Sequence, residues 1–497
     1  MNIGEARYNK RRMKDDRHFV ARMMDAYFAT RLSYFAPLSY RYVFVISLFL
    51  FTVLVNDSHL SGEENIVSMK YRKTTLDSGL RVIMVEHHEL PIVAIELMVK
   101  AGSVHESGEK PGLAHIVAQL LREGTHTKES LAISESIDFI GGSLSVDCEY
   151  DSSSVTTTAL VKHFETILDL LSEVARFPAF NAKEIELYRD KTITAILREK
   201  DNKSSIARRH FSEMLYGGHP YANPPIGTTK GLEAISRAEI IQFHKTHYLP
   251  NNSILTVVGD IDYEKVLACI KETFGGWKRG AVLPPTLPPV PKIDGYKIRI
   301  VNKPDLTQTE IRLGHMGIAR DDPDYFALML LNHIFGRGPA SRLYTKVRSE
   351  KGLTYGANSG FAARKLQGPF YVRTYSKNET AVETLLVVLD ELKKLKSGGV
   401  TKEELESAKS FYVGHYPLSM ETAAQIASKI IVQEFYDLPE DYIDKYLDNV
   451  MAVSMEDIES AIKRVLDPEN MVITLVSKSE EILKEAKALG EVELKEL

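Results

Sequence analysis

Apolar and polar positions alternate along the chain with two periods, the two-residue period of strands and the longer period of helices. Residues 80–102 predict a pair of strands, and residues 297–317 predict a second pair with the same alternation. An apolar helix follows each pair, expected at 112–122 and at 325–335. The two halves of the chain therefore begin with the same succession of elements.

The two halves also end alike. Residues 236–260 (SRAEIIQFHKTHYLPNNSILTVVGD) and residues 454–477 (SMEDIESAIKRVLDPENMVITLVS) each predict a serine-capped helix, a turn and an apolar strand. This repetition indicates a tandem duplication of one α+β unit, and so a fold of two lobes.

A proline-rich stretch separates the halves. Residues 281–292 (AVLPPTLPPVPK) hold five prolines, which favour an extended linker over a helix or a central strand. The predicted organisation is an N-terminal extension over 1–68, an N-terminal lobe over 69–280, the linker, and a C-terminal lobe over 293–497.

The N-terminal extension has the pattern of an export signal. Residues 1–41 carry nine Lys or Arg against four acidic residues, and the uncharged run YVFVISLFLFTVLV follows at 42–55. A run of this length fits the apolar region of a signal peptide better than a membrane span of about 20 residues. We expect an exported protein, periplasmic or anchored in the membrane and facing outward. Whether the leader is cleaved and whether translation starts at Met23 or Met24 stay open, as does a buried strand over 42–55.

Composition and charge exclude few classes of protein. The 497 residues are 44% hydrophobic and 26% charged, which are ordinary values for a globular protein. The formal net charge of −5 gives no general basic character, so we expect no nucleic-acid partner. Cys148 and Cys269 form no disulfide framework and no metal-finger spacing. Two separate core thiols are favoured, and a pairing in an exported protein stays open.

The segment 101–125 (AGSVHESGEKPGLAHIVAQLLREGT) resembles the signature of the insulinase/mitochondrial-processing-peptidase family of zinc peptidases. In that family, Gly-Leu-Ala-His opens a helix that carries the motif His-x-x-Glu-His. The two histidines bind zinc, and the glutamate between them acts as the general base. The corresponding residues are His115, Ala118 and Gln119. Alanine cannot accept a proton and a neutral amide is a poor zinc ligand, so the resemblance implies a degenerate motif.

The third zinc ligand of the family is a glutamate about 75 residues further on. Ala195 stands at that position, and Glu199 lies one helical turn later. With two of three ligands and the base replaced, we expect no zinc in this chain, and His115 becomes a helix or core histidine. An active zinc peptidase that uses His115, Glu199 and an unforeseen ligand is the less favoured alternative.

The second half resembles the family's C-terminal signature. Residues 347–355 (VRSEKGLTY) place Arg348 and Tyr355 at the positions of the family's paired substrate contact. In the family this pair reaches across a chamber between the lobes and supports the oxyanion that forms during peptide attack. A glycine-rich loop precedes it, with Gly336, Gly338 and Ser341. This loop resembles a substrate-contacting loop of the non-catalytic processing-peptidase subunit, and a helix C-cap with a tight turn is the equal alternative.

The resemblance implies a division of labour between two chains. We expect a catalytically inactive, substrate-binding subunit of a heteromeric zinc metalloendopeptidase, with two lobes that enclose a chamber. A homologous partner with intact His-x-x-Glu-His would hold the zinc, and this chain would supply Arg348 and Tyr355 in trans to a peptide or unfolded protein. The alternative from another class is a stand-alone peptide-binding or scaffold protein of the same fold.

Overall fold

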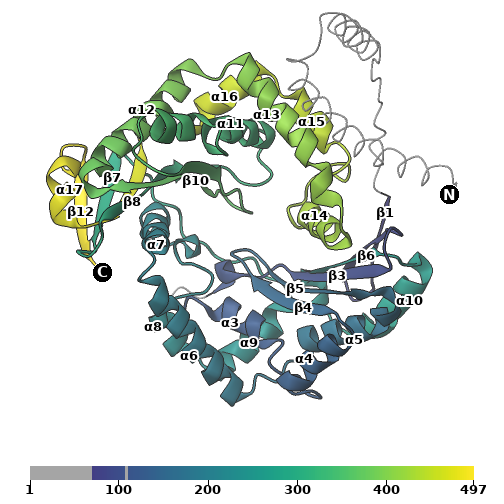
Figure 1. The fold of residues 1–497 in the computed structure, drawn as a ribbon. Coiled ribbons are helices and arrows are strands. Elements are labelled where there is room, and N and C mark those ends of the chain that lie inside the picture. Colours follow the sequence, from purple (N-terminus) through teal and green to yellow (C-terminus); the bar gives the residue numbers. More distant parts are fainter. Residues whose placement is uncertain (1–69, 107–109) are drawn as a thin grey trace, which may run out of the picture. The chain divides into compact units, whose positions relative to one another are not determined.

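The computed structural model describes residues 70–106 and 110–497. The leader predicted at 42–55 lies outside the described residues. The described part folds as two α+β lobes, each built on a six-stranded sheet (Figure 1). This confirms the predicted fold class.

The first sheet has the strand order β1-β2-β6-β3-β5-β4. Strands β2 and β6 are parallel, and the pairs β6–β3, β3–β5 and β5–β4 are antiparallel. Its strands are β1 (Tyr71–Thr75), β2 (Arg81–Glu86), β3 (Ile92–Val99), β4 (Ser143–Cys148), β5 (Ser153–Leu160) and β6 (Ser253–Gly259).

The second sheet repeats this plan in the order β12-β7-β11-β8-β10-β9. Strands β7 and β11 are parallel and the next three pairs are antiparallel, as in the first sheet. Its strands are β7 (Tyr296–Asn302), β8 (Gln308–Met316), β9 (Ala357–Phe361), β10 (Pro369–Lys377), β11 (Met471–Ser477) and β12 (Glu491–Glu496). Five strands therefore match one to one, which is the arrangement that a tandem duplication predicts.

The sheets differ at one edge. Strand β1 runs antiparallel to β2, whereas β12 runs parallel to β7. These edge strands come from opposite ends of the described chain, so they fall outside the repeated unit.

The helices of the first lobe come mostly from the sequence between its strands. They are α3 (Leu113–Leu120), α4 (Ser130–Phe139), α5 (Phe164–Arg176), α6 (Ala182–Glu199), α7 (Lys203–Tyr216), α8 (Thr229–Ala234), α9 (Arg237–His247) and α10 (Tyr263–Phe274). The second lobe contains α11 (Tyr325–Gly336), the π-helical turn η6 (Tyr344–Glu350), α12 (Ala381–Gly398), α13 (Lys402–His415), α14 (Ala423–Phe435), α15 (Tyr446–Ala452), α16 (Met455–Val465) and α17 (Ser479–Ala486).

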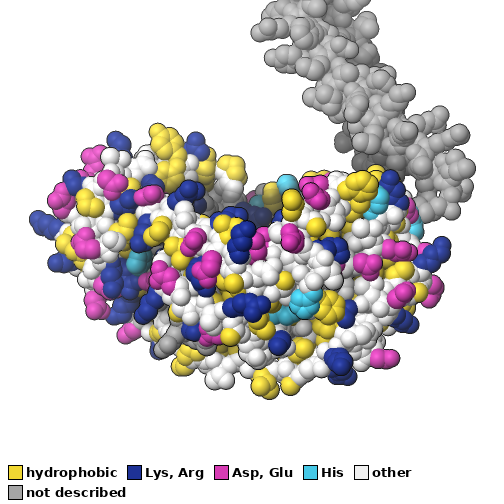
Figure 2. Space-filling view, turned by 90° about the horizontal axis from the view of Figure 1, so that it is seen from below, with side chains coloured by type: hydrophobic (Ala, Val, Ile, Leu, Met, Phe, Trp, Pro, Cys, Tyr) yellow, Lys and Arg dark blue, Asp and Glu magenta, His cyan; other side chains and the backbone are white. Residues whose placement is uncertain are grey.

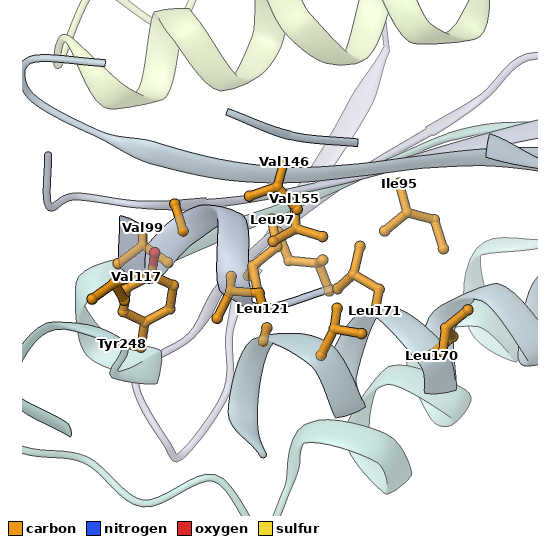
Figure 3. Close-up of a cluster of buried hydrophobic side chains, with 14 of the residues drawn as sticks. Ile95, Leu97, Val99, Val117, Leu121, Val146, Val155, Leu170, Leu171 and Tyr248 are labelled. Carbon is orange, nitrogen blue, oxygen red and sulfur yellow. The ribbon is translucent and has the colours of Figure 1, made fainter. Parts of the chain in front are cut away.

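The central strands β2, β3 and β6 of the first sheet are buried on both faces. On one face, alternate strand residues such as Ile95 and Leu97 pack with α3 and α5. Figure 3 shows Val117 of α3 in this cluster together with Val146 of β4. On the other face, Ile83 and its neighbours pack against α14. A period of two thus supplies two separate cores from one set of strands.

Two helices are exchanged between the lobes. Helix α14 belongs to the second half of the chain but packs on β3 and β6 of the first sheet (Figure 1). Helix α7 belongs to the first half but packs on β8 and β11 of the second sheet. Glu213 of α7 also forms an ion pair with Arg299 of β7, 3.0 Å apart. Each lobe therefore completes the core of the other.

Several local predictions are confirmed. Ser236 and Ser454 both cap their helices through capping boxes. Residues 281–292 contain no helix or strand. Cys148 and Cys269 are separate free thiols, as expected, but only Cys148 is buried in the core and Cys269 is half-buried. Among the described helices, none is both long and apolar enough to cross a membrane.

Candidate functional site

The helix that carries the degenerate motif begins one residue later than expected and is shorter. Gly112 precedes α3 with a φ of 106°, and an added Cβ would lie 2.9 Å from Leu232 Cδ2. The buried carboxylate of Glu106 accepts hydrogen bonds from the backbone N–H groups of Gly112 and Ala114, at 3.1 and 2.8 Å. Burial raises the pKa of Glu106 to about 8. The start of α3 is thus fixed by the backbone and by a buried cap.

His115 faces a neighbouring helix. Its Nε2 lies 3.1 Å from the hydroxyl of Tyr188 on α6, and its buried Nδ1 has no hydrogen-bond partner. Burial lowers the pKa of His115 to about 4, because the charged ring would lose its hydration. At neutral pH the ring is therefore an uncharged group packed between α3 and α6.

The other positions of the zinc motif have different surroundings. Ala118 is fully buried in the core of the first lobe. The Gln119 amide donates a hydrogen bond to the carbonyl oxygen of Val146 on β4, at 2.9 Å. Ala195 is exposed on α6. Gln119 therefore joins α3 to the sheet in the position where the family has a metal ligand.

These residues do not fit a zinc ion. Among the described residues, no group of three or more His, Cys, Asp or Glu could hold a metal. The carboxylate of Glu199 lies 4.0 Å from Arg208 and 3.7 Å from Arg209, so its charge is already balanced by arginine. The ring nitrogen Nε2 of buried His244 is likewise engaged, because it lies 2.8 Å from the carbonyl oxygen of Ala175.

The glycine-rich loop of the second lobe ends helix α11. An added Cβ on Gly336 would lie 2.1 Å from Ser359 Oγ, so only glycine fits there. Gly338 has a φ of 94° and opens onto empty space. Buried Ser341 donates its hydroxyl to the carbonyl oxygen of Gly338, at 2.7 Å. Gly336 and Ser341 are therefore held by the turn itself, and Gly338 is exposed.

Arg348 and Tyr355 lie on either side of one tight turn. The backbone N–H of Gly352 donates to the carbonyl oxygen of Arg348 at 3.0 Å, and Gly352 has a φ of 65°. The Arg348 guanidinium lies 4.8 Å from the ring centroid of Tyr344 and donates to its hydroxyl. Tyr355 is 74% exposed. Both predicted contact residues are thus exposed at the surface.

Comparison with protein families covers most of the two lobes. Residues 81–229 match the insulinase model of peptidase family M16, and residues 234–412 match the model described as the peptidase M16 inactive domain. The chain belongs to the insulinase family of peptidases. The match to both models agrees with the duplicated sheets, one in each half.

Known proteases and solved structures match the chain over most of its length. An uncharacterised zinc protease of Mycobacterium leprae is 27% identical over 399 residues, covering 80% of this chain and 89% of the relative. The crystal structure of a peptidase M16 inactive domain from Pseudomonas fluorescens has a TM-score of 0.78 at 28% identity, covering 82% of this chain and 98% of that one. The periplasmic protease PqqL of Escherichia coli shares the fold with a TM-score of 0.70 at 18% identity; 84% of this chain matches 48% of that one.

Sequence reasoning missed two residues of the site. Tyr188, the α6 partner of His115, stands seven residues before Ala195, which is two helical turns along the same face. Tyr344, the ring beneath Arg348, stands four residues before it. Helical spacing from a predicted insulinase-family position could have found both.

Charge over the surface is mixed. On the face shown in Figure 2, Lys and Arg side chains lie among Asp and Glu side chains. The absence of a nucleic-acid partner stays a prediction.

Proposed function

We propose that this chain is the catalytically inactive, substrate-binding subunit of a heteromeric zinc metalloendopeptidase that acts on peptides or unfolded protein. One contrast carries the proposal. The positions of the zinc motif are occupied by core and sheet contacts, whereas Arg348 and Tyr355 are exposed. A family member with this division needs its catalytic groups from another chain.

The proposed partner is a homologous subunit with an intact His-x-x-Glu-His motif, and its zinc would activate the attacking water. This chain would contribute the substrate contacts from the second lobe. The Arg348 guanidinium and the Tyr355 hydroxyl are donors suited to the negative charge that develops on the peptide carbonyl oxygen. A chamber between the lobes would enclose the substrate. The cation–π contact with Tyr344 supports a fixed orientation of Arg348.

Catalysis in trans is tested by reconstitution. The partner is isolated by co-purification from the native source, and peptide turnover is measured with Arg348→Ala and with Tyr355→Phe. Loss of one oxyanion donor typically costs about 100-fold or more in turnover, so we expect each variant to lose at least about tenfold. The exposed Arg279→Ala serves as the matched control. Assembly is followed by size-exclusion chromatography, so that a loss of turnover can be assigned to the site.

If both variants cleave at the parental rate in an intact complex, Arg348 and Tyr355 are structural. The scaffold alternative, a stand-alone peptide-binding protein of this fold, would then be favoured. Failure of any partner with an intact zinc motif to co-purify would favour the same alternative.

The proposal also requires that the isolated chain holds no zinc of its own. Elemental analysis of the purified chain should give well under one equivalent, and pure protein should not cleave peptides. The ion pairs of Glu199 with Arg208 and Arg209 support this expectation. One tightly held equivalent of zinc, or chelator-sensitive cleavage, would instead establish the self-sufficient peptidase.

The location that we propose for the protein is outside the cytoplasm, periplasmic or anchored in the membrane. The basic flank and the uncharged run at 42–55 support this. N-terminal sequencing should find a mature chain that starts after Val55, or an anchored chain in the membrane fraction. Cytoplasmic protein with an intact leader contradicts the proposal.

A further inference from the structure

A cavity of about 370 Å³ lies within the second lobe, between α11, α13, α14 and α15. Its size is within the range of small-ligand sites. Aromatic rings form much of its wall, namely Tyr325, Phe361, Phe411, Tyr412, Tyr416 and Tyr446. The zinc motif and the Arg348–Tyr355 pair are not part of this wall, so neither role assigned above uses the cavity.

Three cations are associated with these rings. Lys429 Nζ lies 4.8 Å from the ring centroid of Tyr416, and the Arg337 guanidinium lies 6.0 Å from that of Tyr412. Lys429 and Arg337 line the cavity, and Arg320 lies 3.8 Å from the ring of the wall residue Tyr325. Throughout residues 70–106 and 110–497, no ion pair joins any of these three to a carboxylate within 4.0 Å. Their charge near the cavity is therefore not neutralised by the protein.

The cations also act on one another and on a nearby histidine. Burial lowers the pKa of Lys429, and repulsion from Arg320 lowers it further. Burial lowers the pKa of His333 as well, with a further contribution from Arg337. Such repulsion in a partly desolvated site would be relieved by one bound anion.

The wall combines aromatic carbon surface with polar groups such as Asn332 and Ser419. The Tyr416 hydroxyl donates to the carbonyl oxygen of Ile443 at 3.1 Å, and the Tyr446 hydroxyl contacts Met329 Sδ at 3.1 Å. These two hydroxyls are engaged by the protein, so the rings of Tyr416 and Tyr446 contribute mainly their carbon surfaces. The carboxylate of Asp444 acts on Tyr416 by raising its pKa, but Asp444 is outside the cavity lining. Cations on an aromatic wall suit a ligand that is both apolar and negatively charged.

We propose that this cavity binds an apolar or aromatic group that carries a carboxylate, as the C-terminal residue of a peptide does. The assignment rests on the proposed peptide-binding function and specifies the substrate class. Arg337 directly follows Gly336, so the cavity adjoins the glycine-rich loop that was predicted to contact substrate. A peptide seated here would have its terminal carboxylate between Lys429 and Arg337.

The experiment measures direct binding to the full isolated chain, without a partner. The probe is a dye-labelled Gly-Gly-Phe peptide with a free C-terminal acid, compared by fluorescence anisotropy with the same peptide as its amide. The amide cannot form a charged hydrogen bond with Lys429 or Arg337, so the acid should bind at least about tenfold more tightly than the amide. A third peptide, Phe-Asp-Gly amide, tests whether an acidic side chain beside an aromatic residue is the actual source of the carboxylate.

Variants locate the effect. Lys429→Met keeps an unbranched side chain against Tyr416 and removes the charge, so it should abolish most of the preference for the acid. Arg337→Gln should reduce the preference, Lys429→Arg should retain it, and the exposed Lys402→Met should leave it unchanged. Thermal unfolding of each variant shows whether the lobe remains folded.

Equal binding of acid and amide by the parent chain would overturn the assignment. So would an acid preference that survives both Lys429→Met and Arg337→Gln in folded protein. Failure of the proposed function is visible separately, since it appears as unchanged turnover in Arg348→Ala while the acid preference persists.

Discussion

The two lobes share five strands in the same order, yet their functional segments have opposite surroundings. In the first lobe, His115 is packed against Tyr188 and Ala118 is enclosed by the core. In the second lobe, Arg348 and Tyr355 are exposed on a turn. Duplication has preserved the apolar framework in both halves. The difference between them lies in whether the polar side chains are directed to the protein or to solvent.

The largest effect is expected where a zinc-motif residue would be restored in the core of the first lobe. Ala118→Glu places a carboxylate at a fully buried position and should lower the free energy of unfolding by about 3 kcal/mol or more. Ala195→Glu, which restores the third ligand position on exposed α6, should change it by less than about 0.5 kcal/mol. Urea unfolding of both variants compares them. Equal stability of the two would mean that the α3 position is open to solvent.

The next effect concerns the exchanged helices. Ile431 of α14 is fully buried against the first sheet, so Ile431→Ala should lower the free energy of unfolding by about 2–5 kcal/mol. Phe211 of α7 is buried with Val472 of the second sheet, so Phe211→Ala should lower the free energy of unfolding by a similar amount. Leu386 of α12 is 47% exposed, so Leu386→Ala is the matched control and should change the free energy of unfolding little. If Ile431→Ala is equally harmless, α14 is not needed for the first core.

A smaller effect depends on pH. Burial lowers the pKa of His115 to about 4, while an unfolded chain has a histidine pKa of about 6.5. Between these values the unfolded state binds the extra proton, so stability is present above about pH 6.5 and is lost as pH falls toward 4. His115→Gln should therefore flatten the stability profile by about 1–3 kcal/mol over that window.

That profile is measured by urea unfolding at a series of pH values from 4 to 8. His163→Gln, at the start of α5, is compared as a control. If the stability of His115→Gln falls with pH as steeply as that of the parent chain, other groups account for the loss of stability in acid. Burial lowers the pKa of His244 and of His247 to about 4 as well, so part of the dependence of stability on pH should remain in His115→Gln.

The smallest effect sharpens the functional half of the comparison. Arg348→Ala and Tyr355→Phe alter exposed side chains, so each should change the free energy of unfolding by less than about 0.5 kcal/mol. Differential scanning calorimetry of the isolated chain checks this. A large loss of stability would assign the pair a structural role, and any loss of turnover would then have to be interpreted as unfolding.

Much of the fold could be predicted from local pattern. The strand pairs, the apolar helices, the serine caps at Ser236 and Ser454 and the proline-rich linker all follow from periodicity and capping chemistry. In the candidate site, only residues at positions of the family's sequence motifs were predicted, such as His115, Arg348 and Tyr355. Tyr188 and Tyr344 were not predicted, although helical spacing places them on the same faces as the motif residues. Which side chain on such a face makes the contact depends on the packing of the folded chain.

The sequence alone determined that two similar α+β units follow one another and that the residues of the zinc motif are replaced by Ala118, Gln119 and Ala195. These are properties of short segments, and short-range periodicity encodes them. Only the tertiary structure decided that α7 and α14 exchange lobes, and that three cations gather beside aromatic rings within the second lobe. Both depend on contacts between segments far apart in the chain. An apolar helix face is compatible with either sheet, and only the packing of the whole chain selects the one that it covers.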